Sequence, residues 1–110
     1  MWIFLPEGFL SVVADKTKTC FLQVRARRKK VLEQHFPGEP IFENKKSDYR
    51  FRVIIPRARF ALFMSCQITN IDYSNFKNSL PDREKADLDY LELCHEVWSM
   101  TAAYQHTDDE

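Results

Sequence analysis

The sequence predicts an α+β fold, in which a small and mostly antiparallel sheet of about four strands packs against three helices. In some short segments apolar residues alternate with polar ones or form β-branched and aromatic runs, which is typical of strands. In others apolar residues recur every three or four positions, as they do on one side of a helix. The order of these segments is β-β-β-α-β-α-α.

The first segments predict the N-terminal part of the sheet. Trp2 to Leu5 and Phe9 to Ala14 are separated by a Pro-Glu-Gly sequence, which is the spacing of a hairpin with a loop of about three or four residues. Cys20 to Arg27 alternates and predicts a third strand. From Arg28 the period changes to that of a helix, which a Pro-Gly pair then ends.

Asp48 to Ile55 gives the clearest strand pattern in the chain. Its alternation predicts one side buried against helices, formed by Tyr49, Phe51, Val53 and Ile55. The preceding segment, Glu39 to Ser47, has little pattern and predicts a loop. Pro56 ends the strand and opens a helix with a core stripe of Phe60, Phe63, Met64, Ile68 and Ile71.

The last predicted helix runs from Pro81, which acidic residues follow in the first turn, to about Tyr104. Its inward side is expected to hold Leu91, Cys94, Val97, Trp98 and Thr101. The chain has 110 residues, of which 45% are hydrophobic, and this is enough for one core. We therefore expect a single domain over residues 1–105 and a frayed acidic tail over residues 106–110.

Charge and hydropathy argue against bulk nucleic-acid binding and against a membrane helix, although a local basic site remains allowed. Sixteen Lys and Arg balance sixteen Asp and Glu, so bulk nucleic-acid binding is not expected. No apolar run reaches the length of about 18 residues that a membrane helix needs. The hydrophobic N-terminus also lacks the basic region of a signal peptide. The chain is accordingly expected in the cytoplasm, away from membranes.

No motif of catalysis or metal binding is present. The three cysteines, Cys20, Cys66 and Cys94, are widely spaced and are predicted to be reduced and mostly buried thiols. The chain has no Gly-rich phosphate loop and no nucleophile motif, and its histidines lack metal-ligand spacing. We therefore expect a binding protein without catalytic residues, metal or cofactor. A metal-independent hydrolase or nuclease is a further hypothesis, against which the missing motif argues.

Four arginines are the main candidates for a site. The period of a strand places Arg25 and Arg27 on one side of their strand, and Arg50 and Arg52 on one side of theirs. If the two strands are neighbours, the guanidinium groups repel one another unless carboxylates or a bound anion lie among them. Two interpretations stay open: an anion site, or a solvated sheet face on which carboxylates pair with the arginines.

The predicted ligand-binding set adds aromatic and cationic neighbours to these arginines, namely Tyr49, Tyr73 and Lys77. Arginine suits such a site because its planar fork of donors matches phosphate. The segment from Ile71 to Asp82, which supplies the last two residues, can equally consist of helix caps and core contacts.

Several patterns make the chain resemble a group of short bacterial and phage-encoded proteins of unassigned function. They are MWIF..GF.SVV at the N-terminus, then VRAR, DY..R, PR..FA, IDY.NFK and a final Y with VW, and together they span nearly the whole chain. The resemblance implies a stand-alone domain of microbial or phage origin. It marks recurring positions without assigning them roles: Arg25, Arg27, Asp48, Tyr49, Arg50, Asp72, Tyr73, Asn75, Phe76 and Lys77.

The sequence thus predicts a small non-enzymatic protein that holds an anionic or phosphorylated, nucleotide-like ligand on an arginine-rich sheet face. In a phage this protein would act in counter-defence. The alternative hypothesis is a protein inhibitor that docks on and blocks a host nucleic-acid-binding or defence protein. The expected partner is therefore an anionic small molecule or a host protein.

Overall fold

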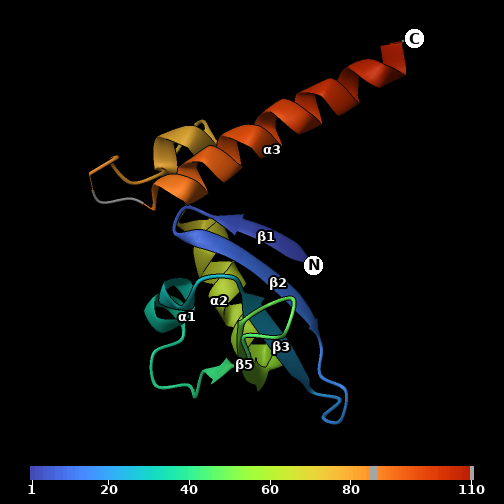
Figure 1. Cartoon of the computed structure of the whole chain (residues 1–110). Coiled ribbons are helices and arrows are strands. Elements are labelled where there is room, and N and C mark those ends of the chain that lie inside the picture. Colours follow the sequence, from blue (N-terminus) through green and yellow to red (C-terminus); the bar gives the residue numbers. More distant parts are fainter. Residues whose placement is uncertain (85–86, 110) are drawn as a thin grey trace. The chain divides into compact units, whose positions relative to one another are not determined.

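The computed structural model describes residues 1–84 and 87–109, and the chain divides into two compact units, Met1–Ser74 and Asn75–Glu110 (Figure 1). The first unit contains the sheet and two helices. The second contains the long C-terminal helix.

The first unit is built on a five-stranded antiparallel sheet with the strand order β1-β2-β3-β5-β4. Its helices are α1 (Lys29–His35) and α2 (Arg57–Thr69). Together with α3 of the second unit they confirm the predicted α+β class with three helices. The strands are β1 (Trp2–Leu5), β2 (Gly8–Ala14), β3 (Phe21–Ala26), β4 (Phe42–Glu43) and β5 (Phe51–Pro56).

The sheet has one strand more than the sequence predicts, because β4 lies in the segment expected to be a loop. It is two residues long and pairs with β5 through Phe42–Arg52 and Glu43–Phe51. The N-terminal hairpin is also tighter than expected. Leu5 pairs directly with Gly8, so two residues form its loop.

The core lies between one side of the sheet and the two helices. Because paired residues of antiparallel strands point to the same side, the registers place Leu10, Ala26 and Phe51 in one row across the sheet. Helices α1 and α2 cover this side. The main contacts come from Val12, Val24, Val53 and Ile55 of the sheet and from Val31, Leu32, Phe36 and Phe60 of the helices.

Three predicted core contacts are wrong, those of Tyr49, Ile68 and Ile71. Tyr49 is buried, but its ring contacts Phe9 on the side of the sheet away from the helices, at 6.4 Å between ring centroids. The reason is that β5 begins only at Phe51 and residues 47–50 form a bend, so the alternation of the strand does not extend back to this position. On α2, Phe60 joins the core, whereas Ile68 is 62% exposed, and Ile71, which lies beyond the end of the helix, is 53% exposed.

In the second unit, a 3-10 helix η1 (Phe76–Ser79) precedes α3 (Leu88–His106), and η2 (Thr107–Asp109) follows it. The predicted start of α3 at Pro81 is wrong, because residues 81–84 are not helical. The helix begins instead where the Asp87 carboxylate accepts a hydrogen bond of 3.1 Å from the Asp89 amide, as an N-cap does. The predicted acidic tail contains η2, and Glu110 lies outside the described residues.

Helix α3 has no buried residue over its 19 positions. Of its predicted inward side, Leu91, Cys94 and Val97 are half-buried, whereas Trp98 and Thr101 are exposed. Among the residues that the structure describes, no helix is long and apolar enough to cross a membrane.

The two units carry opposite charge. The first contains thirteen Lys and Arg against seven Asp and Glu, and the second three against nine, so the net charges are +6 and −6. The zero net charge of the chain is therefore the sum of two opposite charges, one on each unit.

Candidate functional site

Three arginines lie on the side of the sheet opposite α1 and α2, and we call this side the arginine face. Arg25 of β3 stands directly opposite Arg52 of β5, and on its other flank it stands opposite Ser11 of β2. Arg27 follows two residues after Arg25, just beyond the end of β3. The prediction that these strands are neighbours is correct, and the antiparallel register places Arg25 and Arg52 opposite each other in the sheet.

Arg25 is half-buried and has only neutral partners. Its Nη2 donates a hydrogen bond of 2.8 Å to the hydroxyl of Ser11, which is 1% exposed. Its guanidinium lies 4.5 Å from the centroid of the Tyr49 ring, a cation–π contact. The Nε atom is buried without a hydrogen-bond partner. The positive charge of Arg25 is thus positioned by its surroundings but is not neutralised by them.

Arg52 is held by three oxygens, none of which is a carboxylate. Its Nη2 donates to the hydroxyl of Ser47 at 2.9 Å and to the carbonyl of Tyr49 at 3.2 Å. Its Nη1 donates to the side-chain carbonyl of Gln23 at 3.3 Å. Two of these acceptors belong to the bend before β5, so the same contacts attach this bend to the sheet.

Arg27 completes the group. Its guanidinium lies 4.2 Å from the Tyr49 ring centroid, and its Nη1 donates to the carbonyl oxygen of Asp48. The Tyr49 ring therefore contacts both Arg25 and Arg27. Since Tyr49 is only 5% exposed, it is a support for the arginines and not a free stacking surface.

Arg50 does not belong to this group. Its Nε and Nη2 donate to one carboxylate oxygen of Glu43, at 3.0 and 2.7 Å. The hydrogen bond from Arg50 holds the pKa of the Glu43 carboxyl below its ordinary value. The carboxylate-paired interpretation therefore applies to this arginine. By contrast, among the described residues no carboxylate forms a salt bridge with Arg25, Arg27 or Arg52.

The other predicted neighbours lie elsewhere along the chain. Tyr73 is half-buried in the segment after α2, and Lys77 belongs to the second unit. The sequence did not indicate Ser11, Ser47 or Gln23 as polar contacts of the arginines. Two of them could have been found, because Ser11 and Gln23 occupy alternating strand positions on the arginine face.

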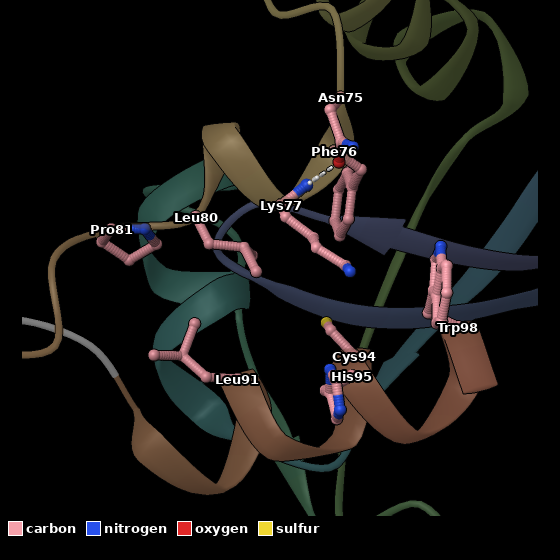
Figure 2. A pocket seen from close by; sticks show the side chains of 9 residues that line it. All are labelled: Asn75, Phe76, Lys77, Leu80, Pro81, Leu91, Cys94, His95 and Trp98. Atoms are coloured by element: carbon pink, nitrogen blue, oxygen red, sulfur yellow. Dashed lines mark hydrogen bonds between the residues drawn. The ribbon is translucent and has the colours of Figure 1, made fainter.

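Lys77 lines a pocket within the second unit (Figure 2). This pocket has a volume of about 320 Å³ and mostly apolar walls. The Lys77 ammonium lies 4.2 Å from the ring centroid of Trp98, and the Lys77 amide donates to the Asn75 side chain at 2.9 Å. The lining residues are Asn75, Phe76, Lys77, Leu80, Pro81, Leu91, Cys94, His95 and Trp98.

Cys94, the single thiol of this unit, is not an activated nucleophile. Burial raises the pKa of the Cys94 thiol, which disfavours the nucleophilic thiolate. Cys20 and Cys66 of the first unit are free and exposed, so their predicted burial is wrong. Within residues 1–84 and 87–109, no group of His, Cys, Asp and Glu is arranged to hold a metal ion.

Comparison with known proteins gives no relative of the chain. No protein-family model, no curated protein and no solved structure matches it. The arginine face is therefore the feature on which a function can be argued.

Proposed function

We propose that the protein is a non-enzymatic binding protein that holds an anionic, phosphorylated ligand on the arginine face through Arg25, Arg27 and Arg52. The observation that carries this proposal is the Arg25–Arg52 pair. Two arginine residues stand opposite each other on neighbouring strands, and the polar groups that contact their guanidinium groups are neutral.

Electrostatics explains why such a pair favours an anion. Like charges directly opposite each other destabilise a sheet, and hydroxyl or carbonyl acceptors do not cancel the repulsion. A phosphate between the two groups would remove the repulsion and accept charge-assisted hydrogen bonds. The existing contacts to Ser11, Ser47 and Gln23 fix the side chains beforehand, so little side-chain entropy is lost on binding.

The biological setting that we propose follows from the resemblance to short phage-encoded proteins. There the chain would act in the cytoplasm in counter-defence and sequester a nucleotide-like signal.

Thermal unfolding in an anion series at fixed ionic strength tests the proposal. A ligand that binds only the folded state stabilises it by about 2.7 kcal/mol at a concentration of a hundred times its Kd. We expect phosphate or a nucleoside diphosphate to raise the Tm of the wild-type protein. The Arg25→Gln and Arg52→Gln variants should lose this response.

Arg50→Gln is the matched control. It removes the same charge from the same region of the sheet, but from an exposed pair with Glu43, so its own cost is below about 1 kcal/mol. It should keep the full response to anions. Arg52→Lys retains the charge but not the fork of donors and should respond weakly. Equal responses of Arg52→Gln and Arg50→Gln would refute the site.

A second candidate is docking on a host protein, and helix α3 is the observation that favours it. The helix has no buried residue, and large apolar side chains such as Trp98, Met100 and Tyr104 are 55 to 78% exposed. Its unit is acidic, which complements the basic surface of a nucleic-acid-binding protein. This candidate takes the place of the first if no anion stabilises the wild-type protein.

A further inference from the structure

A continuous row of side chains crosses all five strands on the arginine face. Paired residues connect β1 to β2, β2 to β3, β3 to β5 and β5 to β4 without a break. Paired residues point to the same side of an antiparallel sheet, so this row lies on one surface. Its members, in order, are Trp2, Ser11, Arg25, Arg52 and Phe42.

The row has an aromatic side chain at each end and two arginines inside. Trp2 is 73% exposed and Phe42 is 52% exposed, although both are large apolar residues. The Trp2 ring also contacts Phe9, at 6.0 Å between centroids and nearly perpendicular. Since Phe9 in turn contacts Tyr49, aromatic contacts connect the exposed indole to the ring that supports the arginines.

We propose that the arginine face binds single-stranded nucleic acid, with Arg25 and Arg52 on the phosphates and with bases stacked on Trp2 and Phe42. This inference rests on the proposed function and names the class of its ligand. Single-strand sites combine a basic track for the backbone with aromatic side chains on which unpaired bases stack. The row contains both parts in one line.

The length of the row favours a single strand over a mononucleotide or a duplex as the ligand that contacts both aromatic side chains. Four strand spacings of about 4.8 Å give a length of about 19 Å, more than a single nucleotide occupies. A rigid sheet of that width also does not enter the major groove of a duplex, which is about 12 Å wide. Paired bases, moreover, offer no free face for stacking. A single strand fits both limits.

The first unit is positively charged, as a binding partner of the negatively charged phosphate backbone should be. The absence of bulk nucleic-acid binding was expected from the zero net charge of the whole chain, but the unit that carries the row has a net charge of +6. Arg25 and Arg52 on the phosphates imply a slope of about −1.4 for the logarithm of affinity against the logarithm of salt concentration.

Fluorescence anisotropy with a labelled oligothymidylate of about twelve nucleotides tests the inference. We expect the wild-type protein to bind it and to ignore a duplex of the same length. Trp2→Ala removes one stacking surface and should weaken binding about five- to a hundredfold. The same variant should keep the Tm response to inorganic phosphate, because the Trp2 ring packs on Phe9, whereas Ser11 and Ser47 hold the guanidinium groups.

The outcomes separate the two proposals. Three results would overturn the single-strand inference. Trp2→Ala and the wild type could bind the oligonucleotide equally well, the wild type could bind the duplex as well as the single strand, or the wild type could bind no oligonucleotide at all. The anion site would still be supported in that case if phosphate raises the Tm of the wild type and Arg52→Gln abolishes this rise. Oligonucleotide binding that Arg52→Gln does not weaken would overturn both. Arg50→Gln is again the control and should bind within about twofold of wild type.

Discussion

Tyr49 shows how one side chain can organise a charged surface. Its ring is buried between the sheet and two guanidinium groups, and its carbonyl oxygen accepts a hydrogen bond from Arg52. A residue that the strand pattern assigned to the core therefore lies on the opposite side, where it sets the spacing of the arginines. The cation–π contacts stabilise this arrangement without neutralising the charges.

Asp15 has a similar organising role in the turn between β2 and β3. Its carboxylate accepts hydrogen bonds from the Gln23 side chain at 3.1 Å and from the Lys18 and Thr17 amides at 2.9 and 3.2 Å. These bonds, that from Gln23 first, lower the pKa of Asp15 from 3.8 to about 2. The folded state therefore binds this proton more weakly than the unfolded chain does.

The sign of this shift gives a prediction about acid stability. The stabilisation from Asp15 is complete above pH 3.8 and is lost as the pH falls towards 2. Asp15→Ala should lower the Tm at pH 7, and its difference from wild type should shrink over that interval and vanish below it. Asp72→Ala, which removes another exposed carboxylate, serves as the control. A difference that persists unchanged at pH 2 would contradict the role of the ionised carboxylate.

At the residue scale the sequence predicted the arginines of the sheet, and Glu43 as one of several possible carboxylate partners, but not the neutral contacts of Arg25 and Arg52. The alternation of each strand alone indicates which side of that strand Arg25 or Arg52 occupies. It does not indicate which residues contact the arginine. The Arg50–Glu43 pair depends on β4, whose two residues carry no periodic signal and pair only because the tertiary structure brings them to the sheet edge. The contact of Tyr49 with Arg25 likewise depends on a bend that no local pattern indicates.

The hairpin of β1 and β2 approaches α1 closely at Gly8. A Cβ atom at this position would lie 3.0 Å from the Cβ and 3.2 Å from the Cγ2 of Val31, which is buried and β-branched and cannot rotate away easily. The absence of a side chain at Gly8 thus allows the start of β2 to pack against the helix.

Gly8→Ala should therefore destabilise the protein by about 1 to 3 kcal/mol through overpacking. Val31→Ala makes room for the added methyl group, so the double variant should lose at least about 0.5 kcal/mol less than the sum of the two single changes. Chemical denaturation measures the three free energies of unfolding. Additive losses would show that the close approach is not the cause.

Elements with a long and regular pattern were predicted best. Strands β2, β3 and β5 and the two helices of the first unit follow from their hydrophobic periods, with ends within a few residues of those expected. The start of α3 was predicted at Pro81 because a proline and acidic residues commonly open a helix. The cap that forms is Asp87, and a sequence with two such signals does not reveal which one the chain uses.

The whole molecule has its apolar core in one of its two units. All of the buried hydrophobic residues among those described, from Leu5 to Phe60, belong to Met1–Ser74. The predicted single domain over residues 1–105 stays a prediction. The distribution of the buried residues implies that the first unit contains the hydrophobic core that it needs to fold by itself.

A chain that ends at Ser74 should accordingly retain cooperative thermal unfolding and the strand signal in circular dichroism. It should also keep the anion response of the full chain, which Arg52→Gln in the same fragment should abolish. An unfolded fragment would show that residues 75–110 contribute to the core of the first unit.

Each unit also contains one of the two tryptophans of the chain, Trp2 in the first and Trp98 in the second. Their surroundings differ, since one indole contacts Phe9 at the sheet edge and the other lies 4.2 Å from a lysine ammonium. The protein therefore carries a separate optical reporter in each unit. With Trp98 replaced by phenylalanine, the tryptophan emission of the chain comes from the arginine face alone, so that quenching by a stacked base can be followed without any label.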